Sequence, residues 1–145
     1  MEKVDYKPPK TPLNIIYKDS TLLVLNKPSG LLSVPGRSES HQDCLITRAK
    51  AEISGILLVH RLDMDTSGVI IFARTPSSQK HLGLQFEKRQ TNKKYIAHIL
   101  GHPINDGGEI NEPIIFDWAN RPRQKICFKT GRPAITKWTV KNRLQ

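Results

Sequence analysis

The sequence has few cysteines and no long apolar run, and both absences exclude classes of protein. Its 145 residues include two cysteines, Cys44 and Cys127, which lie far apart and form no CxxC pair. A disulfide framework is therefore poorly supported, and a reducing cytoplasm suits the chain. The longest apolar runs, such as 22–25 and 68–73, fall far short of the roughly 20 residues that cross a bilayer. We expect a cytoplasmic protein that does not span a membrane.

The sequence also lacks the glycine-rich motifs of nucleotide binding and a clear set of metal ligands. It contains neither GxGxxG nor GxxxxGK[ST], so dinucleotide and triphosphate binding have no motif to support them. Among the five histidines, only His41-x-x-Cys44 approaches ligand spacing, and zinc would need two further ligands. A cysteine hydrolase has as little support. We expect neither a metal nor a cofactor.

The composition is that of a globular domain. Hydrophobic residues make up 37% and charged residues 25% of the chain, which fits neither a disordered nor a collagenous protein. The length corresponds to one ordinary domain, or most of one. Residues 1–12 are polar and carry three prolines, so they are expected to form an extended N-terminal arm. Residues 13–145 remain for the folded part.

Expected strands outnumber expected helices. Aliphatic and alternating runs predict strands at 14–17, 21–26, 56–60, 68–73, 93–100, 124–128 and 134–143, with an extended stretch at 31–36 and short strands around 106–108. Helical spacing predicts one helix that opens at Asp43 and stops at Gly55, and a second over 77–89 after the N-cap Thr75. Phe86 in this second helix is assigned to the core. Because the connections are short, we expect an α+β fold: a mixed, mainly antiparallel sheet with flanking helices packed on one side.

Charge is concentrated in the second half of the chain. The net charge is +10, and residues 80–145 hold thirteen basic and five acidic residues against ten and eight in 1–79. No acidic residue interrupts the basic run Arg121, Arg123, Lys125, Lys129, Arg132, Lys137, Lys141 and Arg143. A lysine-lined strand edge would look similar. However, a domain this basic usually faces a polyanion, because clustered cations release counterions from phosphates. Nucleic acid is the leading partner.

The densest chemistry lies in the insert between two expected strands, His60-Arg61-Leu62-Asp63-Met64-Asp65-Thr66-Ser67-Gly68. Loops on rigid scaffolds are where catalytic groups gather. The insert could also be a polar turn in which Thr66 and Ser67 bond the backbone and Arg61 pairs with Asp65. Asp63 and Asp65 could form the acid and base pair of a glycoside hydrolase, but their spacing does not decide this.

The same insert resembles the signature H-R-L-D-x-x-T-S-G of the RluA-type pseudouridine synthases. The upstream segment 24–36 resembles the family's N-K-P-x-G-L stretch, and Lys93-Lys94-Tyr95-Ile96-Ala97 resembles its K-x-Y-x-A strand. These motifs follow one another in the family's order. With 117–122 and 131–136 also matching, the resemblance covers residues 13–140, and it is strongest to the type that modifies both ribosomal and transfer RNA.

The resemblance implies an isomerase that acts on specific uridines in structured ribosomal or transfer RNA, without metal or cofactor. The family breaks the N1–C1′ bond, rotates the uracil and rejoins it through C5. By the same resemblance Asp63 is the catalytic carboxylate, Tyr95 stacks on the uridine and helps remove the C5 proton, and Arg61 helps displace the flipped nucleotide. We expect RNA contacts from the basic side chains of Lys27, His60, Arg121, Arg123, Lys125 and Arg132. Trp118 and Phe128 are candidates for base stacking or for the core. The protein is expected to be a monomer.

The sequence departs from the family after the last matching segment. Family members continue into G-R-x-H-Q-x-R, whose basic residue pairs with the catalytic aspartate, and the sequence reaches Gln145 without it. We therefore expect residues 13–145 to be the N-terminal portion of the catalytic domain. An RNA-binding module, or an inactive fragment without turnover, is the alternative. Composition cannot separate the two, because a basic mixed-sheet domain would serve both.

Overall fold

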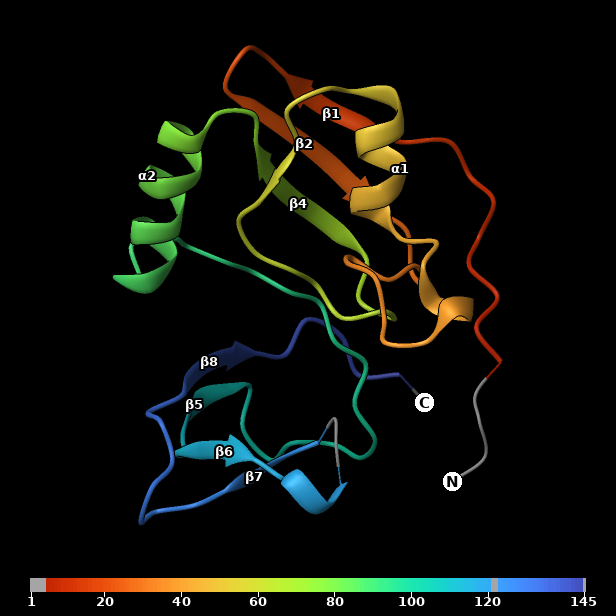
Figure 1. Cartoon of the computed structure of the whole chain (residues 1–145). Coiled ribbons are helices and arrows are strands. Elements are labelled where there is room, and N and C mark those ends of the chain that lie inside the picture. The colour runs from red at the N-terminus through yellow and green to blue at the C-terminus, as the bar shows by residue number, and fades with distance from the viewer. Residues whose placement is uncertain (1–4, 121–122, 145) are drawn as a thin grey trace. The chain divides into compact units, whose positions relative to one another are not determined.

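The computed structural model of the chain describes residues 5–120 and 123–144. It divides into two units, of which the first runs to Lys94 and the second begins at Tyr95. The first unit contains β1 (Ile15–Lys18), β2 (Leu22–Lys27), the 3-10 turn η1 (Glu39–His41), α1 (Leu45–Glu52), β3 (Leu57–Leu58), β4 (Gly68–Ala73) and α2 (Pro76–Glu87) (Figure 1). The second contains β5 (Gly107–Asn111), β6 (Ile114–Phe116), the 3-10 turn η2 (Trp118–Asn120), β7 (Gln124–Ile126) and β8 (Ile135–Thr139).

One antiparallel sheet organises the first unit. Its strand order is β1-β2-β4-β3, and every neighbouring pair is antiparallel. β2 and β4 pair without interruption from Leu22 opposite Ala73 to Lys27 opposite Gly68. This register places the end of β2 beside the beginning of β4. The insert from His60 to Gly68, called the acidic insert below, therefore ends beside Lys27.

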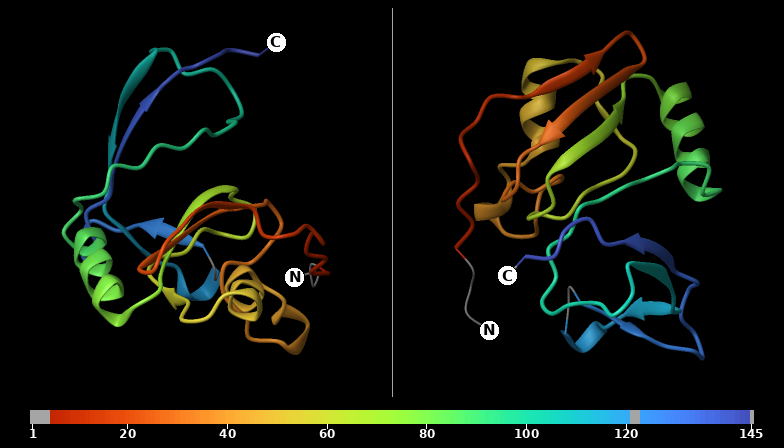
Figure 2. Two further views of the ribbon diagram at one scale, coloured as in Figure 1. Left: turned by 90° about the horizontal axis from the view of Figure 1, so that it is seen from above. Right: turned by 180° about the vertical axis from the view of Figure 1, so that it is seen from behind.

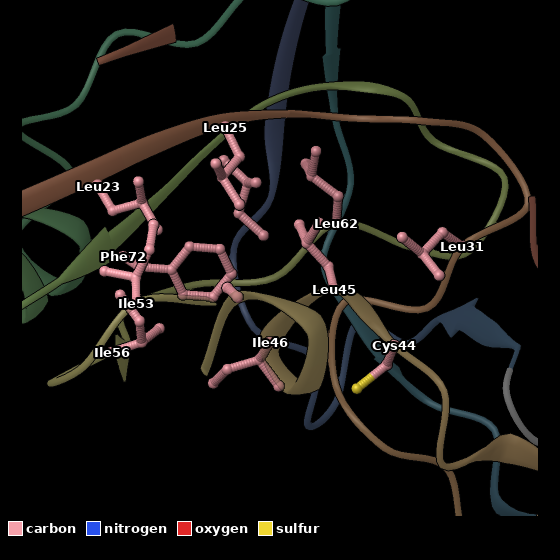
Figure 3. Close-up of a cluster of buried hydrophobic side chains, with 12 residues drawn as sticks. Leu23, Leu25, Leu31, Cys44, Leu45, Ile46, Ile53, Ile56, Leu62 and Phe72 are labelled. Atoms are coloured by element: carbon pink, nitrogen blue, oxygen red, sulfur yellow. The ribbon is translucent and has the colours of Figure 1, made fainter. Parts of the chain in front are cut away.

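The core lies between this sheet and α1, which covers one of its faces (Figures 1 and 2). Side chains alternate along a strand, so every second residue of β2 and β4 points to that face. Figure 3 shows the resulting cluster. It is formed by Leu23, Leu25, Leu31, Cys44, Leu45, Ile46, Ala49, Ile53, Ile56, Leu62, Ile70 and Phe72, all of them buried. Leu62 belongs to the acidic insert, so the core anchors that loop directly.

The second helix begins at a capping box. The Thr75 hydroxyl accepts a bond from the Ser78 N–H at 3.1 Å, and the Ser78 hydroxyl reaches back to the Thr75 N–H at 3.3 Å. Pro76 follows at the first helical position, where a missing N–H costs nothing. The Ser78 hydroxyl also lies 2.9 Å from the Thr21 carbonyl, which ties the start of α2 to the sheet. α2 packs beside β3 and β4.

The second unit consists of two antiparallel pairs. β5 pairs with β8 over five residues and β6 pairs with β7 over three, while Arg132 forms a single bridge to Ile114. All hydrophobic side chains that the described structure buries fully belong to the first unit. Within the described residues, no helix is long and apolar enough to cross a membrane.

The structure confirms the expected α+β class, and the expected strand 68–73 coincides with β4. Several expected boundaries are wrong. The strand expected at 56–60 shortens to Leu57–Leu58, and the one expected at 134–143 shortens to Ile135–Thr139. Residues 93–100 form no strand, because in the described structure no neighbouring segment pairs with their backbone, although their sequence alternates.

Two expectations about helices also need correction. Asp43 does not open α1, whose N-cap is Cys44. The Asp43 carboxylate instead binds the guanidinium of Arg48 through two bonds, of 2.7 and 2.8 Å. Phe86 is half-buried at the end of α2 and does not belong to the core cluster.

Loss of the capping box should destabilise the first unit. We expect Thr75→Ala to lower the free energy of unfolding by about 1 kcal/mol, because it leaves a first-turn N–H without its acceptor. Ser77→Ala is the matched control, since Ser77 is exposed in the same turn, and should change stability by less than about 0.5 kcal/mol. Urea unfolding followed by circular dichroism measures both. Equal effects of the two substitutions would contradict the role of the cap.

Candidate active site

A buried lysine, Lys27, ends β2 and contacts the acidic insert. Lys27 is completely inaccessible to solvent, and its ammonium donates to the carbonyls of Pro28 at 2.9 Å, Leu31 at 2.6 Å and Met64 at 2.8 Å. An ammonium has three donors, so all of them are used. Burial lowers the pKa of Lys27, while the nearby carboxylates of Asp65 and Asp63 act in the opposite direction.

The segment after Lys27 holds the acidic insert by further bonds to its backbone. The Gly30 N–H donates to the Met64 carbonyl at 2.9 Å, and the Ser29 hydroxyl donates to the Asp65 carbonyl at 2.8 Å. The φ of Gly30 is +81°, a conformation that glycine adopts without steric cost. Lys27 and this tight turn therefore fix two consecutive carbonyls of the insert.

Ser33 holds the insert on the side of the core. Its hydroxyl donates to the Leu62 carbonyl at 2.6 Å and accepts from the Leu62 N–H at 3.1 Å, and both residues are buried. Nothing in the spacing of the sequence distinguishes Ser29 and Ser33 from ordinary loop serines. Their one sequence signal is that they lie in the segment 24–36, which matches a motif as a whole.

Asp63 lies between these fixed points and is exposed. Its neighbours Leu62 and Met64 are held by Ser33 and by Lys27, and its own carbonyl accepts from the Thr66 N–H at 3.2 Å. Across the part of the chain that the structure describes, no ion pair involves Asp63, Arg61 or Asp65. The loop thus presents a free carboxylate on a rigid support.

The polar-turn interpretation of the insert is wrong in its details. Arg61 is exposed, and the described structure shows no pair between it and Asp65. The hydroxyls that bond the loop backbone come from Ser29 and Ser33, on another segment. Two hollows border the loop: one of about 660 Å³ is lined in part by Ser67, and one of about 210 Å³ by Met64 and Gly30.

Lys27 and His60 were expected to contact RNA, but the structure places their side chains inside the first unit. Lys27 has neither exposed surface nor a spare donor for a phosphate, because its three bonds hold the loop. His60 is half-buried, and its Nε2 accepts from the Ile71 N–H at 3.0 Å. Burial, and to a smaller extent the charge of Lys93, lower the pKa of His60. Both side chains act inside the first unit, as supports of the loop and of β4.

The other expected site residues lie in the second unit. Tyr95, its first residue, is 62% exposed. Arg123, Lys125 and Arg132 are exposed, and Lys125 lies 3.6 Å from the Asp117 carboxylate. Arg121 lies outside the described residues. Trp118 and Phe128 are exposed and therefore do not belong to a core.

No metal centre accompanies this site in the described ranges. Nowhere in 5–120 or 123–144 do three or more histidine, cysteine, aspartate or glutamate side chains gather as metal ligands. The chemistry available from the described residues is that of an exposed carboxylate, a guanidinium and an aromatic phenol.

The match to known families extends over most of the chain. The family model described as RNA pseudouridylate synthase matches residues 21–144, and the chain therefore belongs to this family. Curated relatives include the dual-specificity RNA pseudouridine synthases RluA of Salmonella typhi and Escherichia coli K12, each 48% identical over 137 residues. The RluA protein of Haemophilus influenzae is 47% identical over 145 residues.

The chain corresponds to part of these relatives. The match covers 94% of the chain but 63% of the Salmonella and Escherichia proteins, and 99% of the chain but 66% of the Haemophilus protein. Two solved structures share the fold. Human RNA pseudouridylate synthase domain containing 1 matches with a TM-score of 0.73 and 23% identity, covering 92% of this chain and 55% of that one. Domain containing 4 matches with 0.59 and 24%, covering 88% and 53%.

Removal of the buried ammonium should loosen the loop. We expect Lys27→Met to lower the free energy of unfolding by about 2 kcal/mol, because the carbonyls of Pro28, Leu31 and Met64 each lose a donor. Lys80→Met, at an exposed position on α2, is the matched control and should change it by less than about 0.5 kcal/mol. Chemical denaturation measures both. A Lys27→Met variant as stable as the wild type would show that the cost of burying the charge cancels the three bonds.

Proposed function

We propose that this chain supplies the catalytic aspartate of an enzyme that isomerises uridine to pseudouridine in ribosomal or transfer RNA. The observation that carries the proposal is the exposed carboxylate of Asp63, on a loop held on both sides by buried groups. Membership of the RNA pseudouridylate synthase family and the names of the relatives support the reaction and the RNA classes. A cytoplasmic location and a monomeric state stay predictions.

The chemistry of the loop suits attack on a ribose. An ionised carboxylate can add to C1′ or take the proton from C2′, and in either step the N1–C1′ bond breaks and its electron pair leaves with N1 of the uracil. Holding the carboxylate on a fixed backbone removes conformational freedom that would otherwise be lost in the transition state. The target uridine must leave its base stack to reach such a group, and an exposed aromatic face such as that of Tyr95 can hold a flipped base.

Arg61 is suited to the step that opens the RNA. Its guanidinium is exposed two residues before Asp63 and has no carboxylate partner in the described structure, so it can contact RNA without first breaking an ion pair. Guanidinium groups both bond phosphates and stack on bases. Arg61 is therefore proposed to occupy or displace the position of the flipped nucleotide.

Substitution of the catalytic carboxylate tests the proposal. In the full-length gene product, Asp63→Asn should reduce C5 tritium release from labelled uridine in ribosomal and transfer RNA by about a thousandfold or more, since an amide can neither attack nor accept the proton. RNA binding should survive, because phosphate contacts dominate it. Asp65→Asn is the control and should keep most of the activity.

The outcomes also separate the alternatives. Equal losses at Asp63 and Asp65 would favour the paired carboxylates of a glycoside hydrolase. An Asp63→Asn variant that retains turnover would remove this residue from the reaction. RNA binding by the wild type without tritium release would support the binding module.

The basic residues of the second unit are proposed as an RNA-backbone surface. Arg123, Lys125 and Arg132 are exposed in this unit, and so are the aromatic side chains of Trp118 and Phe128. Cations that neutralise phosphates release condensed counterions, whereas aromatic faces stack on unpaired bases. The position of Arg121 in the sequence makes it a further candidate for the same surface.

The salt dependence of binding tests this surface. The double substitution Arg123→Gln with Lys125→Gln should weaken binding across RNA sequences and flatten the plot of log K against log salt by roughly 0.7 to 0.9 per lost phosphate contact. Lys50→Gln with Lys80→Gln removes two exposed lysines from helices of the first unit and should leave the slope unchanged. If the first pair also leaves the slope unchanged, its side chains do not contact phosphates.

A further inference from the structure

Three side chains that the proposed reaction does not use meet at the end of α2. The rings of His60 and Phe86 are stacked, with their centroids 4.6 Å apart and their planes inclined by 21°. The Lys93 ammonium lies over the Phe86 ring, 5.7 Å from its centroid. All three residues belong to the first unit. We call them the His60–Phe86–Lys93 stack.

The stack joins the two segments that carry the proposed catalytic groups. His60 precedes Asp63 by three residues, and Lys93 precedes Tyr95 by two. We propose that Phe86 is a positioning residue: through His60 and Lys93 it fixes the loop of Asp63 and the start of the segment of Tyr95 to the same point of the first unit. This inference rests on the proposed function and adds to it a residue that touches neither substrate nor reacting atoms.

On the side of Asp63, the stack completes the support of the loop. β3 pairs with β4 and ends at Leu58. Beyond this end, the His60 ring bonds to β4 by accepting the Ile71 N–H at 3.0 Å. Only a neutral imidazole has this acceptor, and burial favours the neutral form by lowering the pKa of His60. Contact with Phe86 fixes the plane of the ring. His60 and the buried Leu62 thus hold the chain just before Asp63.

On the side of Tyr95, the stack holds a segment without regular structure. α2 ends at Glu87. Arg89 follows with a φ of +54°, and the bond from the Gln90 N–H to the Gln85 carbonyl, at 2.9 Å, turns the chain back. Residues 91–94 then form neither helix nor strand. The contact of Lys93 with Phe86 restrains them. Because an extended chain advances at most about 3.6 Å per residue, Tyr95 stays within about 7 Å of Lys93 along the backbone.

Both contacts need the aromatic ring of Phe86. A cation is attracted to the negative face of a π system, and ring pairs gain stability from their stacked geometry beyond apolar burial. A leucine at position 86 would keep an apolar side chain but lose both interactions. A tyrosine would keep them. This difference separates positioning by the ring from simple packing.

The test compares turnover of the full-length gene product and its variants on one RNA substrate. Phe86→Leu should lower kcat for C5 tritium release by about tenfold, and Lys93→Gln by about two- to fivefold, as expected for one cation–π contact. KM should change by less than about twofold in both. Phe86→Tyr and Lys93→Arg, which keep the ring and the cation, should retain the kcat of the wild type. Lys94→Gln removes the same charge one residue further along, where the described structure shows no cation–π contact, and should leave kcat unchanged.

A second measurement tests the anchor without turnover. Trypsin cleavage after Lys94 should be faster in Phe86→Leu and in Lys93→Gln than in the wild type and in Phe86→Tyr, because the exposed segment loses its restraint and can fit the protease more readily. Lys93 is exposed, so Lys93→Gln keeps the fold even if Phe86→Leu does not. Unchanged cleavage in Lys93→Gln would overturn the anchor.

The two failures are distinct. A wild type that releases C5 tritium while Phe86→Leu and Lys93→Gln keep its kcat would overturn the positioning role and leave the proposed function standing. A loss confined to KM would make Lys93 an RNA contact and would also overturn that role. A wild type that binds RNA without releasing tritium would remove the proposed function, and the inference with it.

Discussion

The burial of one positive charge constrains the whole site. The Lys27 ammonium is removed from water and lies among three carbonyl oxygens, one of which belongs to Met64 in the acidic insert. Moving a charge out of water is costly unless each donor finds an acceptor. The insert therefore cannot shift away from β2 without leaving a buried ammonium donor unpaired. The two chain segments are fixed to each other by this requirement, although 37 residues separate Lys27 from Met64.

The same constraint explains how a rigid loop can present an accessible group. Leu62 is buried in the core, and the carbonyl of Met64 is bound by Lys27 and Gly30, while Asp63 between them is exposed. Both flanking residues are held through the backbone or the core, so the carboxylate of Asp63 takes no part in holding the loop. An aspartate that stabilised the fold would have its oxygens occupied. This separation of support from chemistry is what preorganisation of a catalytic group requires.

The elements that sequence reasoning located correctly are those with local causes. β4 follows from an aliphatic run of strand length, and the start of α2 follows from Thr75 and Pro76, whose effect on the backbone is local. The role of Lys27 could not be predicted, because a lysine is ordinarily exposed and its acceptors lie on a distant segment. The strand expected at 93–100 fails for the related reason that an alternating pattern specifies a face but not a pairing partner. The choice of Asp63 over Asp65 as the proposed catalytic residue rests on the motif resemblance, because their spacing does not distinguish the two.

The two units differ in what they contain. The first contains the buried core, which suits a precise arrangement of a few groups. The second contains exposed strands, exposed aromatic and apolar side chains, and eight basic against four acidic residues. Its charge is not needed for folding, since the ion pairs described there are solvent-exposed on at least one side and contribute little. The fold does not use this surplus of cations, which supports the proposed contact with a polyanion. The basic run in the sequence supports the same proposal.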